Sequence, residues 1–325
     1  MNSTRHVTFH EIRPFLWSML TIYVAVVTIE GVWIALEHLR FKSTLLLSVT
    51  ENSLIFTLIT MVCWCIRATR VIAYVLTIFG ILFAFLCPLT ILSELATRAA
   101  MPLTDDYLSA ADRALGFDWL AYHDWLTARP GLSRLLWFCY QSMGCQVLLL
   151  MILLPLIGER RHTERMALTL ICGLLITIAC GGLFPAIGSN YYYLQADPAG
   201  TASLIEAVRA GQHLSSTLDD FKGTITFPSY HTIAAFAIML AARPLRFLGW
   251  IFIIINGTAL LGIPLHGSHY LVDCIAGAAI AWGLNWLLCR LHANRSDQPH
   301  PRSGFAFPRD VLQADPCTGE SQQGW

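Results

Sequence analysis

Long apolar segments separated by short polar ones run through most of the chain. A helix needs about 20 mostly apolar residues to cross the hydrocarbon core of a bilayer. On this criterion the pattern predicts about eight membrane-spanning helices, and the sixth is short because an Arg-Pro pair ends it. The predicted segments are 15–37, 45–66, 71–95, 135–157, 166–187, 229–242, 245–264 and 270–291.

Three polar stretches interrupt or follow these segments. Residues 98–134 combine several aspartates with aromatic side chains, which predicts an external segment of one or two amphipathic helices lying on the membrane surface. Thr104 is the expected N-cap there, and Trp119 is expected at the membrane–water interface. Residues 188–227 are predicted to form a long external loop. Residues 292–325 are polar and rich in proline and glycine, and this composition predicts a disordered tail.

Composition supports lipid as the solvent. Of 325 residues, 55% are hydrophobic and 13% are charged, and the mean hydropathy is +0.57; soluble domains carry about 25% charged residues. The net charge is zero, so nothing indicates a nucleic-acid partner. The ten cysteines lie mostly inside apolar segments and lack the spacing of a zinc site or a disulfide framework. We therefore predict an all-α integral membrane protein.

The arginines in the short turns indicate the orientation, because cytoplasmic loops are enriched in Arg and Lys. The tightest turns all fall on one side of the predicted bundle, and their arginines are Arg67, Arg70, Arg160, Arg161, Arg165, Arg243 and Arg246. That side is predicted to be cytoplasmic. An even number of helices then places both termini in the cytoplasm, in a plasma membrane or a bacterial inner membrane.

Candidate chemistry begins at the start of the sixth segment, in the sequence Phe-Pro-Ser-Tyr-His-Thr at 227–232. Pro228 suits the first turn of a helix, where its missing N–H costs nothing. Ser229 and His231 would then lie beside free backbone N–H groups and the positive end of the helix dipole. Such a terminus readily binds anions.

The second candidate sequence opens the eighth segment. His269 and Asp273 are spaced i, i+4, which predicts that both lie on one face of a helix. A carboxylate beside an imidazole fixes the tautomer and orientation of the ring. A charged residue inside a spanning helix is expensive and indicates function. Gly277, four residues later, would let another helix approach closely.

Both candidate sequences begin helices on the same side of the membrane, because one spanning segment lies between them. Two imidazoles, a carboxylate and a helix N-terminus can therefore meet in one pocket on the external or periplasmic side. This set of groups suits phosphoryl transfer through a covalent histidine, with the second histidine as the acid.

The two sequences resemble the type 2 phosphatidic acid phosphatase superfamily, and within it the inositol phosphorylceramide synthase-like branch. That branch carries Pro-Ser-x-His and His-Tyr-x-x-Asp-x-x-x-Gly, which here occupy 228–231 and 269–277. The resemblance implies a six-helix catalytic core within 71–291, preceded by N-terminal transmembrane helices in 1–70 and followed by the tail at 292–325. It also implies that neither a metal nor another cofactor is needed.

The resemblance further implies a role for each residue. His269 would be the nucleophile that takes the phosphoryl group, and Asp273 would orient it. His231 would protonate the leaving oxygen and later act as the base for the acceptor. Ser229 and nearby backbone N–H groups would hold phosphate oxygens. The substrate would be a lipid phosphate ester, either hydrolysed or transferred to an acceptor lipid alcohol.

The chain departs from the wider superfamily in its basic residues. The superfamily has Lys-x6-Arg-Pro before the first motif, and residues 188–227 contain no such sequence. It also has Ser-Arg six to seven residues before the nucleophile, where this chain has Gly262 and Ile263. Lys222 and Arg209 are the predicted substitutes for binding phosphate.

Other interpretations remain open. The same fold could serve a non-catalytic lipid transporter or scramblase. Ser229 could be the nucleophile of an intramembrane serine hydrolase, or only a helix cap. His231, His266 and His269 could hold the metal of a lipid oxidase, and His269 and Asp273 could simply tie two helices together.

Overall fold

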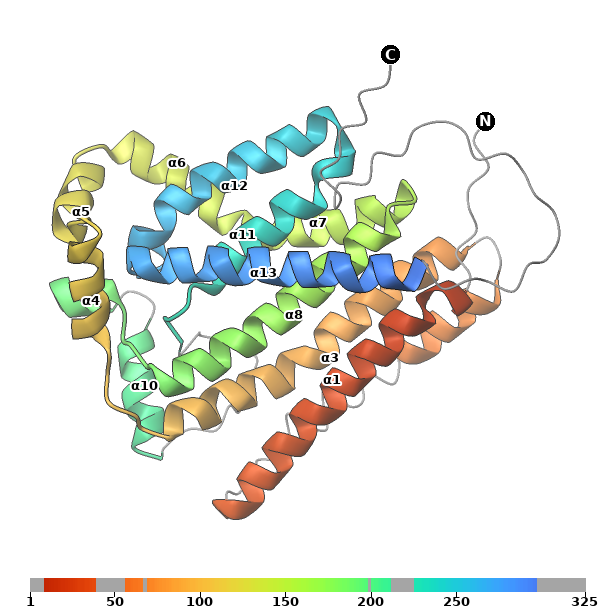
Figure 1. Ribbon diagram of the computed structural model, residues 1–325, viewed down its shortest axis with the longest axis horizontal. Coiled ribbons are helices and arrows are strands. Elements are labelled where there is room, and N and C mark those ends of the chain that lie inside the picture. The colour runs from red at the N-terminus through yellow and green to blue at the C-terminus, as the bar shows by residue number, and fades with distance from the viewer. Residues whose placement is uncertain (1–8, 39–55, 67–68, 198–199, 212–224, 297–325) are drawn as a thin grey trace.

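A computed structural model describes residues 9–38, 56–66, 69–197, 200–211 and 225–296. Within these ranges the chain is helical and contains no strand (Figure 1). A short helix at Phe56–Cys65 precedes α3. The elements are α1 Phe9–Leu36, α3 Arg70–Arg98, α4 Asp105–Ala114, α5 Trp119–Thr127, α6 Pro130–Gln141, α7 Met143–Leu156, α8 Arg160–Leu183, α9 Ser189–Leu194, α10 Thr201–Arg209, α11 Tyr230–Ala241, the 3-10 turn η3 Arg243–Leu245, α12 Phe247–His266 and α13 Leu271–Ser296.

Several of these helices are suited to crossing a membrane. Five described segments are long and apolar enough: Glu11–Leu36, Arg70–Arg98, Arg160–Leu183, Phe247–His266 and Leu271–Leu291. Helices α6 and α7 meet at a bend of 42° and could together form a sixth. The chain is thus a multi-pass membrane protein, but the predicted count of eight is not established.

Neither of the two remaining predicted spans is long enough in the described residues to cross a membrane as a helix, and the sixth is short as predicted. Helix α11 has 12 residues, which at 1.5 Å per residue is about 18 Å and shorter than the roughly 30 Å hydrocarbon core. In the predicted second span, only Phe56–Cys65 is described as a helix, and 45–55 lie outside the described residues.

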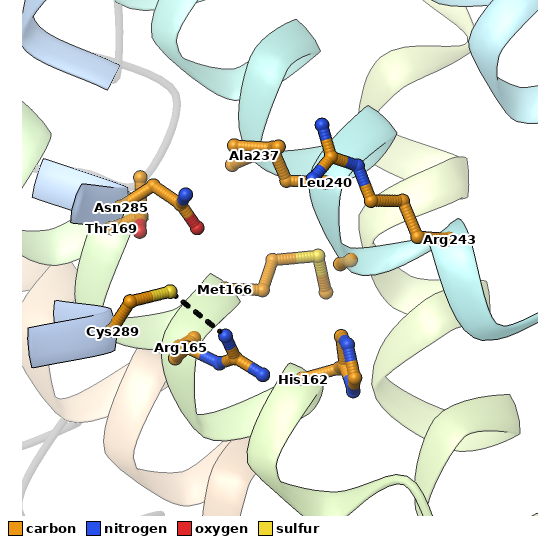
Figure 2. Close-up of a pocket in the computed structure, with 10 residues that line it drawn as sticks. His162, Arg165, Met166, Thr169, Ala237, Leu240, Arg243, Asn285 and Cys289 are labelled. Atoms are coloured by element: carbon orange, nitrogen blue, oxygen red, sulfur yellow. Dashed lines mark hydrogen bonds between the residues drawn. The ribbon is translucent and has the colours of Figure 1, made fainter. Parts of the chain in front are cut away.

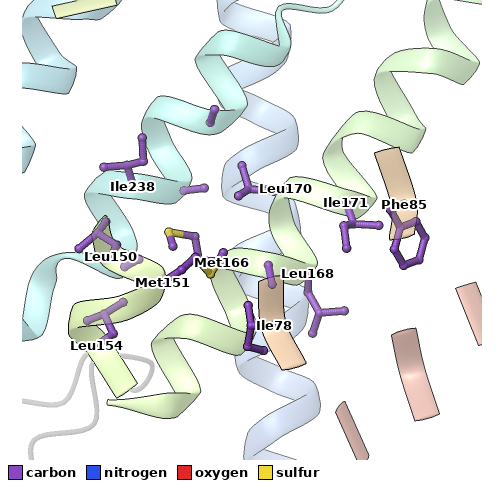
Figure 3. Close-up of a cluster of buried hydrophobic side chains, with 14 of the residues drawn as sticks. Ile78, Phe85, Leu150, Met151, Leu154, Met166, Leu168, Leu170, Ile171 and Ile238 are labelled. Atoms are coloured by element: carbon purple, nitrogen blue, oxygen red, sulfur yellow. The ribbon is translucent and has the colours of Figure 1, made fainter. Parts of the chain in front are cut away.

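The core forms where α8 and α11 pack against each other and against their neighbours α3, α12 and α13. Its buried apolar side chains come from α3, α7, α8 and α11 and include Ile78, Leu150, Met166 and Ile238 (Figure 3). The helices approach closely because small residues face large ones. A Cβ added at Gly173 of α8 would lie only 2.7 Å from Ile233 of α11. The apolar pattern of the chain therefore produces a bundle with α11 enclosed by longer helices.

The helices α4 and α5 gather at the end of the bundle where α13 begins (Figure 1). The prediction of one or two helices in this segment is confirmed. Thr104 is the N-cap residue of α4 as predicted, but its hydroxyl donates to the Pro185 carbonyl and makes no capping hydrogen bond. Trp119 is buried rather than at an interface, and its indole N–H donates to the Pro264 carbonyl. Packing against α12 thus outweighs the surface preference of this aromatic residue.

The stretch predicted as one long external loop is only partly a loop. It contains α9 and α10, and Ser189 and Asn190 of α9 contact the segment that joins α12 to α13. Residues 212–224, which include Lys222, lie outside the described residues. The same holds for 297–325, the main part of the predicted tail.

Candidate active site

The N-terminus of α11 carries the first candidate histidine. Ser229 is the N-cap: its hydroxyl oxygen accepts from the backbone N–H of Thr232 at 3.3 Å. The helix begins at Tyr230, so Pro228 precedes the cap and does not lie in the first turn as predicted. The backbone N–H of Ser229 donates to the Asp273 carbonyl at 3.1 Å, which ties α11 to α13. His231 therefore sits in the first turn, at the positive end of the helix.

The second candidate histidine precedes a helix rather than lying on one. Helix α13 begins at Leu271, so His269 is outside it and Asp273 is in its first turn. One carboxylate oxygen of Asp273, Oδ2, accepts from the Tyr270 backbone N–H at 3.0 Å and lies 3.3 Å from Nδ1 of His269. The pair exists because Asp273 reaches back to cap its own helix. The prediction that His269 and Asp273 share one face of a helix was therefore wrong. The two residues meet because His269 comes just before α13 and Asp273 lies in the first turn of that helix.

The two imidazoles face each other across the boundary between α11 and α13. Their ring centroids lie 5.8 Å apart, with 65° between the ring planes. Nε2 of His231 lies 2.9 Å from the hydroxyl of Tyr140, and those two rings are 4.6 Å apart. The structure thus brings together His231, His269 and Asp273, and adds Tyr140, which the sequence had not indicated.

Burial governs the protonation of the second histidine. His269 is 4% exposed and Asp273 is completely buried. Burial lowers the pKa of His269 to about 4, against an opposing contribution from a hydrogen bond to the Thr226 backbone. The imidazole is therefore neutral near pH 7 and keeps a lone pair for nucleophilic attack. Oδ1 of Asp273 is buried without a hydrogen-bond partner among the described residues.

Two aspartates of α4 hold the start of α13 and the segment before α9. The Asp112 carboxylate accepts from the backbone N–H groups of Leu271 and Val272, at 2.9 and 2.8 Å. Asp105 accepts from the N–H groups of Ile187 and Gly188, both at 3.0 Å. The Tyr270 hydroxyl also donates to Asp105, at 2.9 Å. Helix α4 therefore fixes the position of the segment that carries His269.

Sequence reasoning missed these two aspartates as site residues. It assigned the aspartates of 98–134 to external helices on the membrane surface, whereas Asp105 is 5% exposed and Asp112 is fully buried. Burial also raises the pKa of Asp112, although the two N–H donors oppose that shift. Their spacing of seven residues puts both on one face of α4, and that was the available signal.

The backbone of His269 is also held by the start of α9. The buried Ser189 hydroxyl donates to the His269 carbonyl at 3.1 Å. At the neighbouring Gly188, φ is 108° and an added Cβ would lie 2.7 Å from the Ser268 carbonyl oxygen, so only glycine fits. The start of α9 and the segment before α13 thus pack backbone to backbone.

The structure does not bring the predicted phosphate-binding residues together at the two imidazoles. Ser229 is fully buried, and its described contacts are those of a helix cap. Arg209, in the last turn of α10, donates to the Met101 carbonyl at 2.9 Å, and the structure joins it to neither imidazole. Lys222 lies outside the described residues.

The positions where the superfamily carries Ser-Arg are packed between helices. A Cβ at Gly262 would approach Leu136 of α6 to 3.0 Å, and Ile263 is completely buried. An arginine would have no room here. The departure in the sequence therefore reflects tight packing of α12 against α6.

The histidine grouping expected for a metal-dependent oxidase does not form among the described residues. Nε2 of His266 lies 3.0 Å from the Ser133 carbonyl of α6. Within the described part of the chain, no three His, Cys, Asp or Glu side chains are arranged to hold a metal ion.

Gly277 is expected to be essential for the contact between α11 and α13. An added Cβ would lie 2.5 Å from the Ser229 carbonyl oxygen and 3.0 Å from Cβ of Thr232. Gly277→Ala should therefore push the helices apart and destabilise the protein by about 1–3 kcal/mol, as overpacking does. The unfolding midpoint of the detergent-solubilised protein measures this loss.

Gly283→Ala is the matched control, because nothing lies within 4 Å of a Cβ added there on the same helix. It should leave the midpoint unchanged or raise it slightly. Equal midpoints for the two variants would contradict the proposed close contact.

Comparisons with known proteins agree with this geometry at the level of the family. A sequence model of the PAP2 superfamily matches residues 106–287, which is more than half of the chain and includes both histidine sequences. Curated proteins gave no match, and neither did solved structures. With the matched region covering α4 to α13, the chain belongs to the PAP2 superfamily, whose members are membrane phosphoesterases or phosphotransferases acting on lipid phosphates.

Proposed function

We propose that this protein cleaves a lipid phosphate ester through a phosphohistidine on His269. The observation that carries the proposal is the pairing of two imidazoles 5.8 Å apart, one of them backed by a buried carboxylate at 3.3 Å. A phosphoryl group held between the two rings would have a nucleophile on one side and an acid on the other, which is the arrangement an in-line displacement needs.

In the first step, Nε2 of His269 attacks phosphorus while Nδ1–H donates to Asp273. The bond between phosphorus and the ester oxygen breaks, and His231, which takes up a proton when the anionic phosphate lies beside it, gives that proton to the ester oxygen. The leaving alcohol departs, and the phosphoryl group stays on His269. Asp273 stabilises the positive charge that develops on the ring.

In the second step, the now neutral His231 takes a proton from water or from an acceptor alcohol. The resulting oxygen attacks phosphorus, the bond to Nε2 breaks, and His269 returns to its neutral form. Because Tyr140 contacts Nε2 of His231 at 2.9 Å, its hydroxyl must give way to the leaving or attacking oxygen. Tyr140 is thereby a positioning residue for the acid.

The charge of the phosphate calls for hydrogen-bond donors. The N–H groups of Tyr230 and His231 at the start of α11 supply two, aided by the helix dipole. Helix α13 cannot do the same, because Asp112 already occupies its first N–H groups. Lys222 and Arg209 remain the proposed cationic partners, and Ser229 a proposed phosphate contact.

An apolar cavity beside the site supports a lipid substrate. It measures about 290 Å³ and lies between α3, α7, α8 and α11. Tyr230, the neighbour of His231, forms part of its wall, and the other lining side chains are mostly apolar, among them Phe85, Leu89, Leu170 and Leu174. An acyl chain in this cavity would place its phosphate end near the first turn of α11.

Filling this cavity should affect long-chain substrates selectively. Leu174→Trp adds bulk to the wall and is expected to lower kcat/KM for a long-chain lipid phosphate by about tenfold, the equivalent of roughly 1.4 kcal/mol. A water-soluble short-chain phosphate ester should be cleaved at the unaltered rate. Leu148→Trp, at an exposed position of α7, is the control, and an equal loss on both substrates would refute the chain-binding role.

Hydrolysis and transfer share the phosphohistidine and differ in the acceptor. We propose transfer to an acceptor lipid alcohol, as in the inositol phosphorylceramide synthase-like branch, on the strength of the two motifs and the missing Ser-Arg pair. We also propose that the site faces the external side, with both termini cytoplasmic, because the arginine-rich turns lie at the other end of the helices.

The deciding experiment offers the purified protein a panel of radiolabelled lipid phosphates with and without alcohol acceptors. The proposal expects an acid-labile, base-stable phosphoenzyme, and labelled acceptor lipid in excess of free phosphate. Free phosphate alone would identify a hydrolase. No turnover of any lipid phosphate, with binding retained, would favour a transporter or scramblase.

The serine hydrolase alternative has less support. The described hydrogen bonds of Ser229 reach Thr232 and Asp273, and none of them joins its hydroxyl to an imidazole. Labelling of Ser229 by a fluorophosphonate would reverse this preference.

A further inference from the structure

A polar cavity lies at the end of the bundle opposite to the two histidines. It is bounded by the start of α8, the end of α11, the 3-10 turn η3 and the later part of α13, and measures about 40 Å³ (Figure 2). Its polar lining residues are His162, Arg165, Thr169, Arg243 and Asn285. From Asp273 to Cys289 of α13 the distance along the helix is about 24 Å at 1.5 Å per residue, so this cavity is separate from the candidate active site.

The charges around the cavity are of one sign. Arg165 and Arg243 approach it from α8 and η3, and none of the described residues that line it is acidic (Figure 2). A carboxylate contacts one lining residue from outside the cavity: Oε2 of Glu159 lies 3.0 Å from Nδ1 of His162. Two guanidinium groups at one small cavity repel each other, and an anion between them relieves that repulsion.

Several donors at the cavity have spare capacity. Arg165 uses Nη1 on Cys289 Sγ at 3.1 Å and Nε on the Arg161 carbonyl at 3.3 Å, which leaves Nη2. The guanidinium of Arg243 and the amide of Asn285 have no hydrogen-bond partner among the described residues, and Asn285 points toward the cavity (Figure 2). Asn285 is half-buried and Arg243 is exposed, so water can reach both groups, and a ligand that accepts hydrogen bonds can replace that water.

The position of Arg165 gives a further reason. It lies in the second turn of α8, after Arg160, Arg161 and His162. Cations near a helix N-terminus oppose the helix dipole, whereas an anion there is favourable. Basic cavities between transmembrane helices at the cytoplasmic side are also where anionic headgroups bind.

We propose that this cavity binds a phosphate group, held by Arg165, Arg243 and Asn285, at a site distinct from the one that performs the chemistry. The cavity has room for about three water-sized spheres at the 10–15 Å³ that one water needs, which suits a single phosphate. The ligand is either the headgroup of an anionic lipid or free phosphate. Phosphate binding here does not depend on the proposed catalysis, because it uses none of the residues of the active site; only the argument for a cytoplasmic lipid headgroup rests on the proposed orientation.

The test uses the full chain in lipid nanodiscs and measures the unfolding midpoint. Two probes separate the sources: inorganic phosphate titrated into phosphatidylcholine discs, and phosphatidylglycerol added to the discs without phosphate. Chloride at equal ionic strength controls for screening. Binding to the folded state raises the midpoint.

Two variants test the cavity itself. Arg243→Gln removes a cation, and Asn285→Leu removes a donor without a change of charge. Each should raise the ligand concentration needed for half of the stabilisation by about tenfold, the effect of losing one charge-assisted hydrogen bond. Arg161→Gln, an exposed arginine of the same helix end that does not line the cavity, should respond as the unaltered chain does.

Each outcome has a meaning. A response to phosphate alone identifies free phosphate as the ligand, and a response to phosphatidylglycerol alone identifies a lipid headgroup. Equal responses of Arg243→Gln and Arg161→Gln would overturn the proposal. So would the absence of stabilisation by both probes, or a stabilisation that only His231→Ala removes, since that would place the phosphate in the active site.

Discussion

Replacing His269 by alanine is expected to abolish turnover of lipid phosphate, with a loss of at least about 10⁴-fold in kcat, the scale seen when a nucleophile is removed. No other described side chain at the site combines a neutral imidazole with a carboxylate at 3.3 Å. The phosphoenzyme should disappear with the activity, whereas binding of the lipid should persist. Phosphate release and acid-labile labelling of the protein measure both effects.

His266→Ala is the matched control for this result. His266 lies three residues earlier, and its ring contacts the Ser133 carbonyl rather than the other imidazoles. It should lose less than about tenfold in kcat, even if the lost hydrogen bond costs about 1 kcal/mol of stability. Activity above about a tenth of normal in His269→Ala would reject the nucleophile. A complete loss in Ser229→Ala, with His269→Ala active, would instead establish the serine hydrolase.

Replacing Asp112 by alanine is expected to produce the second largest effect. It leaves the partly buried backbone N–H groups of Leu271 and Val272 without their acceptor, and a buried group that loses its partner costs about 1–3 kcal/mol. The start of α13 should shift, and His269 and Asp273 should move with it. We expect a loss of about 10²-fold in kcat, as small misplacements cause, together with a lower unfolding midpoint.

Asp124→Ala provides the comparison, because that side chain is 81% exposed on α5 and contacts its neighbour His123. Its activity and midpoint should match those of the unaltered protein. Asp112→Asn should keep part of the activity, since the amide oxygen can still accept one of the two N–H bonds. If Asp112→Ala were as active and as stable as Asp124→Ala, helix α4 would not position the site.

The apolar pattern anticipated most of the helical architecture. The predicted segments at 71–95, 166–187, 245–264 and 270–291 correspond to α3, α8, α12 and α13 within a few residues. Such long segments can be recognised in the sequence because the lipid bilayer requires nearly every residue of a spanning helix to be apolar. The shortness of α11 was also anticipated, from the Arg-Pro pair that follows it, whereas the bend between α6 and α7 was not, because packing against neighbours determines it.

The site was anticipated in part. Counting helices placed His231 and His269 at the same end of the bundle, and the structure brings their rings to 5.8 Å. Tyr140 and Asp112 were not anticipated, because their contacts join residues 91 and 159 or more positions apart. No local pattern encodes a hydrogen bond of that span.

By itself, the sequence determined that this chain lies in a membrane and indicated two helix starts as its candidate site. Both conclusions rest on local physics: a lipid solvent demands apolar residues, and a helix start exposes N–H groups whatever surrounds it. Only the tertiary structure decided that Asp273 caps its own helix while facing His269. It also decided that Asp105 and Asp112 accept hydrogen bonds from the backbone next to the site. Those roles depend on which buried donors lacked an acceptor, and that is known only once the helices are packed.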